Sequence, residues 1–229
     1  MPIFRCQSKY ERDLHRVGYR FVAGIDEVGR GSLFGPVYAA AVILSPDKPI
    51  RGLRDSKVLQ ADRREVLAER IRERAVSCSV AAADVFEIDR LNILQASRLA
   101  MLRAVQKLTP APDYLLVDAV AVDFPVPQRA LIHGDAVSQC IAAASILAKV
   151  ARDECMNRWH QVFPVYGLAN NKGYYTPDHI EALDKNGPTM MHRFSFEPVR
   201  KHCAVELWSG YPETEQMELF SQVAGEAWP

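Results

Sequence analysis

The chain of 229 residues has the length of one large domain, or of one domain with a small appendage. Its composition of 48% apolar, 24% charged and 9% aromatic residues is typical of a globular protein and excludes the disordered and fibrous classes. No run approaches the roughly 18 consecutive apolar residues that a membrane-spanning helix needs. We therefore expect a cytoplasmic protein that has no membrane partner and is a monomer.

Charge is distributed unevenly along the chain. The formal net charge is zero, but residues 204–229 hold five glutamates and no lysine or arginine, which leaves 28 basic against 23 acidic side chains in residues 1–203. We predict a folded domain over residues 1–203, with a helical C-terminal portion, and an acidic tail over 204–229. Arginine supplies 20 of the basic residues and suits phosphate contacts, although genome composition explains this usage equally well. The charge distribution is thus compatible with a nucleic-acid partner but does not require one. The five scattered cysteines form no C-x-x-C motif.

The first half of the chain alternates short apolar runs with helical patterns. Runs at 19–26 and 37–44 flank a glycine-rich turn and predict an antiparallel pair of strands. Residues 60–75 predict a helix, 77–84 a third strand, and the broad apolar stripe over 91–108 a second helix.

The second half continues this alternation. A strand is predicted at 111–119 and another at 129–136, followed by a helix from Ser138 to about Trp159 and a short helix at 176–187. Ser138 and Thr176 are the predicted N-caps of these two helices. Strands first, then helices alternating with strands, indicate an α/β fold: a mixed sheet flanked by helices.

Acidic residues stand at the ends of three predicted strands. Asp26 and Glu27 end the first run, and Asp118 and Asp135 end two later ones. Because sites in α/β sheets gather at the carboxyl ends of strands, we expect these carboxylates to converge, although each alone could be an ordinary exposed or capping carboxylate. Adjacent strand residues face opposite ways, so Asp26 and Glu27 share a site only if the chain bends there, which Gly29 would allow.

Converging carboxylates need protons or cations. Two unit charges about 4 Å apart repel by about 4 kcal/mol at an effective dielectric constant near 20. Oxygen ligands without nearby cysteine or paired histidine favour Mg²⁺ or Mn²⁺ over zinc. Two such ions suit phosphodiester hydrolysis, because one activates a water and the other stabilises the leaving oxygen.

The glycine-rich segment "GRGSLFG" does not have the spacing of a dinucleotide-binding loop, and Pro36 with an apolar run follows it instead of a helix. The backbone of Gly29 to Gly31 could lie against a ribose 2′-hydroxyl, with Arg30 on a phosphate, while a tight turn is the simpler explanation of the two glycines. Tyr174, in the loop "NNKGYYTP", could stack on a nucleotide or be half-buried.

Several segments resemble one known family. "GIDEVGRG", "DSK", "LNIL", "LLVDA", "HGDA", "IAAASILAKVARD", "NNKGYYT" and "GPTMMHRFSFEPV" follow the order and spacing of bacterial ribonuclease HII, the type 2 ribonuclease H, over roughly residues 18 to 200. The resemblance implies an RNase H-like fold and endonucleolytic cleavage of RNA in RNA/DNA hybrids. It also implies nicking at single ribonucleotides embedded in duplex DNA, with 3′-hydroxyl and 5′-phosphate products.

The resemblance also assigns roles to residues. It implies four metal-binding acids, a Gly-Arg-Gly element that contacts the 2′-hydroxyl, a tyrosine that stacks on the next sugar, and a lysine that contacts a phosphate. The four metal-binding acids would be Asp26, Glu27, Asp118 and Asp135, and the Gly-Arg-Gly element would be Gly29, Arg30 and Gly31. The stacking tyrosine would be Tyr174, and the phosphate-contacting lysine would be Lys57.

The sequence departs from the family pattern at five positions. Val58 and Val137 replace frequent basic residues, Phe194 interrupts an arginine pair, Ser32 replaces a proline, and Ala119 replaces a glycine. Each lost cation removes a possible phosphate contact, so these departures bear on affinity and its salt dependence more than on the chemistry.

The acidic tail contains "QMELF", Gln216–Phe220, which resembles the peptide by which bacterial replication proteins bind the sliding clamp. The alternative is a C-terminal helix that packs Met217, Phe220 and Val223 on the body of the protein. For the whole chain, two other functions stay open: a non-catalytic hybrid-binding module, and another nuclease of the same superfold, such as a junction resolvase.

Overall fold

The computed structural model describes residues 8–53, 56 and 59–203. Its centre is a five-stranded sheet with strand order β3-β2-β1-β4-β5. Strand β2 is antiparallel to both of its neighbours, whereas β1, β4 and β5 run parallel to one another. The strands are β1 Val22–Val28, β2 Val37–Ile43, β3 Ser77–Ala83, β4 Tyr114–Asp118 and β5 Gln128–Leu131. The predicted mixed sheet and its antiparallel first pair are confirmed.

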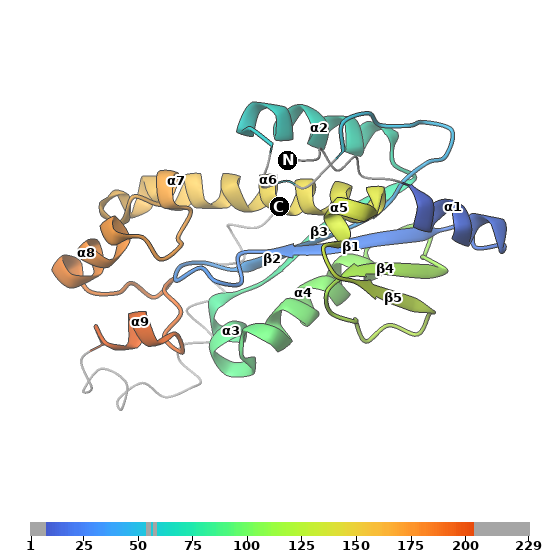
Figure 1. The fold of residues 1–229 in the computed structure, drawn as a ribbon. Helices are drawn as coiled ribbons and strands as arrows, with labels where there is room; N and C mark the ends of the chain where they lie inside the picture. The colour runs from blue at the N-terminus through green and yellow to red at the C-terminus, as the bar shows by residue number, and fades with distance from the viewer. Residues whose placement is uncertain (1–7, 54–55, 57–58, 204–229) are drawn as a thin grey trace.

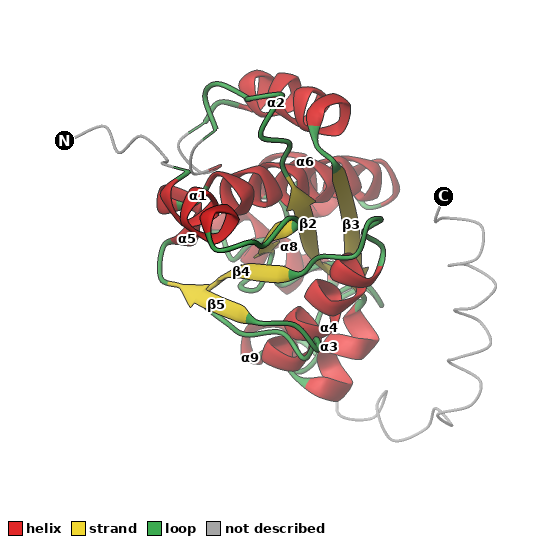
Figure 2. Cartoon of the chain, turned by 90° about the vertical axis from the view of Figure 1, so that its right-hand side faces the viewer, coloured by secondary structure: helices red, strands yellow, loops and turns green. Residues whose placement is uncertain are grey.

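Helices cover both faces of the sheet (Figure 1). Helix α4 packs on one face, α6 crosses the other, and α2 lies on α6. The helices are α1 Lys9–Arg16, α2 Ala61–Arg74, α3 Val85–Leu91, α4 Ile93–Gln106, α5 Gly134–Val137, α6 Gln139–Val162, α7 Leu168–Asn171, α8 Pro177–Asn186 and α9 Glu197–Arg200, with a 3₁₀ turn at Pro164–Tyr166. Viewed from the side, the molecule is a sheet between two helical layers (Figure 2).

Small residues let the layers approach closely. Along β2, Ala39 and Ala41 face the α4 layer, while Ala40 faces the α6 layer. On β1, a Cβ added to Gly24 would lie 2.1 Å from the carbonyl carbon of Cys140, so the first turn of α6 touches the strand's backbone. This contact fixes α6 directly over β1, the strand that carries the first two acids.

Side-chain caps define the starts of the two helices that follow the site. Ser138 accepts a hydrogen bond from the backbone of Ile141 at the start of α6, as predicted. Thr176 caps α8 in the same way through the backbone of His179.

The helix predicted over 91–108 is confirmed as α4, which begins after its N-cap Asn92, at φ +72°, while the separate helix α3 that precedes Asn92 was not predicted. The strand predicted to reach Asp135 ends at Leu131, because His133, with φ +54°, turns the chain into α5. Asp135 therefore belongs to a short helix and not to a strand end.

Candidate active site

Asp26 and Asp118 lie on neighbouring strands and face the same side of the sheet. In the parallel pair of β1 and β4, Ile25 lies opposite Val117, so the next residue of each strand is an acid. The side chain of Asp26 is buried on the α6 side, where Ser145 of α6 hydrogen-bonds to it. The register of the sheet thus places the carboxylates of Asp26 and Asp118 next to each other.

Glu27 reaches the site differently from what the sequence predicted. The chain does not bend after Asp26: β1 stays paired with β2, with Asp26 opposite Ala40 and Glu27 opposite Ala39. The two acids leave opposite faces of the strand. They still interact, because the backbone N–H of Glu27 donates to Oδ1 of Asp26 at 2.8 Å and the negative charge of Asp118 acts on both.

Asp135 lies in the short helix α5, within the connection between β5 and α6. The backbone N–H of Gly134 donates to Oδ1 of Asp118 at 2.8 Å, which ties this connection to the end of β4. A Cβ on Gly134 would lie 2.6 Å from Cδ1 of Ile141 and 3.1 Å from Oδ1 of Asp118, so any larger residue here would have to move these side-chain atoms. Asp135 is only 6% exposed, and its charge reaches Asp26.

The charges of the other three acids all act on Asp26. Burial raises the pKa of Asp26 well above its usual value, and the charges of Glu27, Asp118 and Asp135 raise it further. Burial also raises the pKa of Glu27, against the effect of Arg30, whose Nη1 lies 3.3 Å from Oε1 of Glu27. The ionised form of Asp26 is therefore disfavoured, first by burial and then by its acidic neighbours.

These carboxylates fit a hard divalent cation in charge and donor chemistry. Oε2 of Glu27 is buried and receives no hydrogen bond from any described residue, so it is a buried acceptor that lacks a partner. Within the described ranges, however, no three His, Cys, Asp or Glu side chains already form a group that could hold a metal ion. A bound ion would have to draw the oxygens closer together.

The Gly-Arg-Gly segment follows β1 directly, three residues after Asp26. Gly29 has φ +95°, and a Cβ there would lie 2.2 Å from Nε of Arg152, so this position requires glycine. Gly31 is exposed, and a Cβ there would meet nothing within 4 Å. The first glycine thus shapes the loop, and the second leaves open backbone beside the acids.

Tyr174 lies against the same loop. It forms an isolated β-bridge with Ser32, and the neighbouring Gly173 carbonyl accepts the backbone N–H of Leu33 at 2.8 Å. The guanidinium of Arg152 lies 5.1 Å from the centre of the Tyr174 ring. The structure therefore brings together the Gly-Arg-Gly segment and the tyrosine, which are far apart in sequence.

Two buried arginines support this loop, and the sequence analysis missed both. Arg193 donates to the carbonyl of Arg30 at 2.8 Å and to that of Gly35 at 2.9 Å, and Arg152 donates to Oγ of Ser32 at 2.6 Å. Both side chains are 0% exposed. Arg152 stands four residues before the buried Met156 on α6, a spacing that places it on the buried face of the helix. Ser32, the replacement for a family proline, is the residue that holds Arg152.

Lys57, predicted to contact a phosphate, lies outside the described residues. Its neighbour Ser56 is described, and its hydroxyl lies 2.8 Å from that of Ser145, the partner of Asp26. Ser56 itself is therefore linked to Asp26 through the hydroxyl of Ser145.

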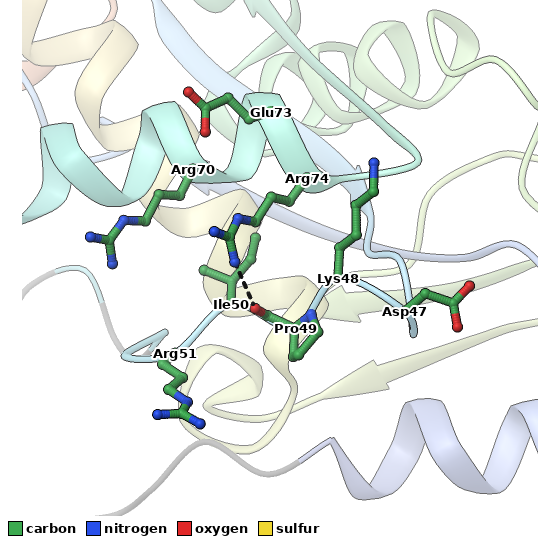
Figure 3. Close-up of a pocket in the computed structure, with 8 residues that line it drawn as sticks. All are labelled: Asp47, Lys48, Pro49, Ile50, Arg51, Arg70, Glu73 and Arg74. Carbon is green, nitrogen blue, oxygen red and sulfur yellow. Dashed lines mark hydrogen bonds between the residues drawn. The ribbon is translucent and has the colours of Figure 1, made fainter.

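Two surface hollows lie elsewhere. One is formed by the loop at Asp47–Arg51 and the end of α2, with Arg74 donating to the carbonyl of Pro49 at 3.3 Å (Figure 3). The other is lined by residues of β3 and Arg103. None of the four acids lines either hollow. Of the helices in the described part of the chain, none has the length and apolar character needed to cross a membrane.

Comparison with known proteins gives a consistent result. The family model described as Ribonuclease HII matches residues 23–199. Ribonuclease HII of Solibacter usitatus (strain Ellin6076) is 61% identical over 217 residues, which are 95% of this chain and 93% of the relative. Ribonuclease HII of Koribacter versatilis (strain Ellin345) is 55% identical over 195 residues, 85% of this chain and 77% of the relative.

Solved structures share the fold. Ribonuclease H2 from Pyrococcus horikoshii OT3 has a TM-score of 0.68 at 26% identity, covering 80% of this chain and 96% of its own. The RNase HII in a PCNA complex from Archaeoglobus fulgidus has a TM-score of 0.67 at 26% identity, covering 78% and 96%. Bst-RNase HIII, solved in complex with Mn²⁺, has a TM-score of 0.60 at 20% identity, covering 82% and 70%. The predicted RNase H-like fold is confirmed.

Proposed function

Because this chain belongs to the ribonuclease HII family and is thus a type 2 ribonuclease H that cleaves the RNA of RNA/DNA hybrids, we propose that it also nicks duplex DNA at single embedded ribonucleotides. Cleavage 5′ to the ribonucleotide would leave a 3′-hydroxyl and a 5′-phosphate. These products suit ribonucleotide excision and primer removal, which would take place in the cytoplasm. The protein would act as a monomer.

One observation supports the proposal above all: the exposed backbone of Gly31 lies in the loop that directly follows β1, the strand of Asp26 and Glu27, and the next residue, Ser32, forms a β-bridge with Tyr174. A ribose 2′-hydroxyl both donates and accepts hydrogen bonds, and backbone groups without a side chain can approach it closely. A recognition surface next to the hydrolytic acids would place the cut at the sugar that it recognises.

The four acids would hold Mg²⁺ or Mn²⁺. Asp26, Glu27, Asp118 and Asp135 offer the oxygen donors that these cations prefer. Burial and, after it, the charges of the other three acids raise the pKa of Asp26, and a bound cation would favour its ionised form. When bound, a pair of such ions supplies an activated water and a stabilised leaving oxygen. In this chain, Ser145 and the Gly134 backbone orient two of the four carboxylates.

Arg30 and Tyr174 would hold the nucleic acid around the cut. Arg30 pairs with Glu27 at 3.3 Å, and with 40% of its side chain exposed it could exchange that carboxylate for a phosphate. Tyr174 would stack its ring on the sugar of the following deoxynucleotide. Replacing Tyr174 with Ala should therefore impair cleavage more than replacing it with Phe, since stacking needs the ring; an equal loss would implicate the hydroxyl instead.

The test uses two duplexes that differ in one atom. A labelled DNA duplex with a single ribonucleotide is incubated with the protein and Mg²⁺ or Mn²⁺, beside an all-DNA duplex of the same sequence. We expect one nick 5′ to the ribonucleotide and an intact control. Equal cleavage of both duplexes would favour a nuclease that does not need a 2′-hydroxyl, and cleavage of neither would overturn the proposed nicking at single ribonucleotides. Failure to cleave a long RNA/DNA hybrid as well would favour a hybrid-binding module.

The acidic tail carries a separate proposal. Residues 204–229, including Gln216–Phe220, lie outside the described residues, and we propose that this tail docks on the bacterial sliding clamp while residues 1–203 form the catalytic domain. The Archaeoglobus fulgidus RNase HII was solved in complex with PCNA, so one relative of this fold binds a clamp. A clamp pull-down of the full chain beside a chain ending at residue 203 tests this, and equal retention of both would end the idea.

A further inference from the structure

Two histidines outside the acidic site touch each other beneath Tyr174. His179 of α8 and His192 are both 0% exposed, and their Nε2 atoms lie 3.2 Å apart. The Nδ1 atom of His179 lies 3.0 Å from the carbonyl oxygen of Tyr174, and Nδ1 of His192 lies 2.9 Å from the backbone nitrogen of Thr189. These contacts form a continuous hydrogen-bond network from Thr189 through the two histidines to Tyr174.

The partners in this hydrogen-bond network determine which ring nitrogens of His179 and His192 carry protons. A backbone N–H can only donate, so Nδ1 of His192 must accept and carries no proton. A carbonyl oxygen can only accept, so Nδ1 of His179 must carry a proton and donate it to Tyr174. If both rings are neutral, His192 carries its proton on Nε2 and donates it to the bare Nε2 of His179.

The surroundings keep both rings neutral. Tyr166 packs edge-on against His192 with ring centres 4.8 Å apart, and Phe34 does the same at 4.9 Å. Burial lowers the pKa of His192 to about 3, helped by His179, and burial also lowers the pKa of His179. An added proton would make two N–H groups face each other, which the neutral arrangement avoids.

We propose that His179 and His192 are positioning residues for the substrate-binding tyrosine, a role that rests on the proposed function of Tyr174. Their donated hydrogen bond fixes the carbonyl of Tyr174, while the backbone N–H of Tyr174 donates to the carbonyl of Asn171 at 3.0 Å. With both ends of the residue held, its ring stays over Arg152 beside the Gly-Arg-Gly segment. The histidines act on the tyrosine and touch neither the acids nor the proposed path of the substrate.

The first test observes the protons directly in the unmodified protein. Histidine ¹⁵N chemical shifts distinguish a protonated ring nitrogen from a bare one. We expect His179 to carry its proton on Nδ1 and His192 on Nε2 at neutral pH. The same tautomer on both rings, or a charged ring, would overturn the proposal without any variant being made.

The second test separates the two ends of the His179 ring. In His179→Asn, the side-chain amide can occupy the place of Nδ1 and still donate to Tyr174, whereas in His179→Gln it reaches the place of Nε2 instead. We expect His179→Gln to lower kcat/KM on the single-ribonucleotide duplex about fivefold, the usual effect of one lost hydrogen bond, and His179→Asn to lower it less than twofold. An equal fall for both would contradict a role through the tyrosine carbonyl.

A double-mutant cycle distinguishes positioning from mere stability. If His179 acts through Tyr174, His179→Gln should change kcat/KM less than twofold when Tyr174 is already alanine. The same fivefold factor in both backgrounds would overturn the proposal. Unmodified protein that cleaves neither duplex would instead mean that the proposed function has failed, so the two failures are distinguishable.

Discussion

Gly29 and Gly31 stand two residues apart and should respond oppositely to the same substitution. At Gly29 an alanine would take a backbone conformation with φ +95° and place its Cβ 2.2 Å from Nε of the fully buried Arg152. At Gly31 the backbone has no positive φ and the Cβ would meet nothing within 4 Å. Gly31→Ala is therefore the matched control for Gly29→Ala.

The expected loss of stability follows from two effects. A left-handed conformation costs an alanine about 1–2 kcal/mol relative to glycine. Moving Arg152 breaks its 2.6 Å hydrogen bond to Ser32, and a hydrogen bond from a charged group contributes about 1.5–3 kcal/mol. Gly29→Ala should thus lower the free energy of unfolding by roughly 3 kcal/mol, or Tm by about 6–12 °C. Gly31→Ala should stay within about 1 kcal/mol of the unmodified protein.

The assay combines urea unfolding with cleavage of the single-ribonucleotide duplex. We expect Gly31→Ala to unfold like the unmodified protein and yet to lose at least tenfold in kcat/KM, because its methyl group would occupy the surface proposed for the 2′-hydroxyl, with about 1.4 kcal/mol for each factor of ten. If Gly31→Ala cleaves normally, this backbone does not contact the sugar. If Gly29→Ala unfolds normally, the packing of Arg152 against the loop is not as described.

Three further predictions address the acids, one strained residue and the buried histidines. Asp118→Asn should keep the fold, because the Oδ1 atom of asparagine can still accept the hydrogen bond from the Gly134 N–H. It should lower kcat by about 10²–10³-fold, as removal of one electrostatic group in an active site typically does. An unchanged kcat would show that Asp118 does not belong to the active site. Ala119 has φ +57°, so Ala119→Gly should raise the free energy of unfolding by about 0.5–1 kcal/mol in urea titrations, and a decrease would refute the strain. His192 has a folded-state pKa of about 3, below the unfolded value near 6.5, so the unfolded chain binds the proton more tightly. Stability should be full above pH 6.5 and fall toward pH 3 by up to about 1.4 kcal/mol per pH unit, and His192→Asn should show a shallower fall; identical slopes would contradict this.

The sequence predicted the parts of the fold that depend on local pattern. The apolar runs that became β1, β2 and β4 and the caps at Ser138 and Thr176 needed no tertiary information. The separate helix α3 before Asn92 was missed, although asparagine is a common N-cap and "DVFE", Asp84 to Glu87, has the spacing of a capping box. An apolar stripe alone does not reveal where one helix stops and the next begins.

The sequence supplied the proposed members of the candidate site but not its geometry. The four acids, the Gly-Arg-Gly segment and Tyr174 were named from the sequence, and the structure brings the loop and the tyrosine together. The prediction that Asp135 ends a strand was wrong, because the position of Asp135 depends on the turn at His133 and on how closely Gly134 packs against Ile141. Arg193 and the histidine pair were missed because their partners lie far away in the sequence or across a loop, where periodicity carries no information.

The central claim is that four carboxylates on β1, β4 and α5 share hard cations. The direct measurement is calorimetric titration of Mn²⁺ into the unmodified protein and into the single variants Asp26→Asn, Glu27→Gln, Asp118→Asn and Asp135→Asn, each in the presence of an uncleavable hybrid. We predict measurable binding by the unmodified protein and weaker binding by every variant, because each loses one charged oxygen ligand. Binding that none of the four substitutions alters would contradict the claim.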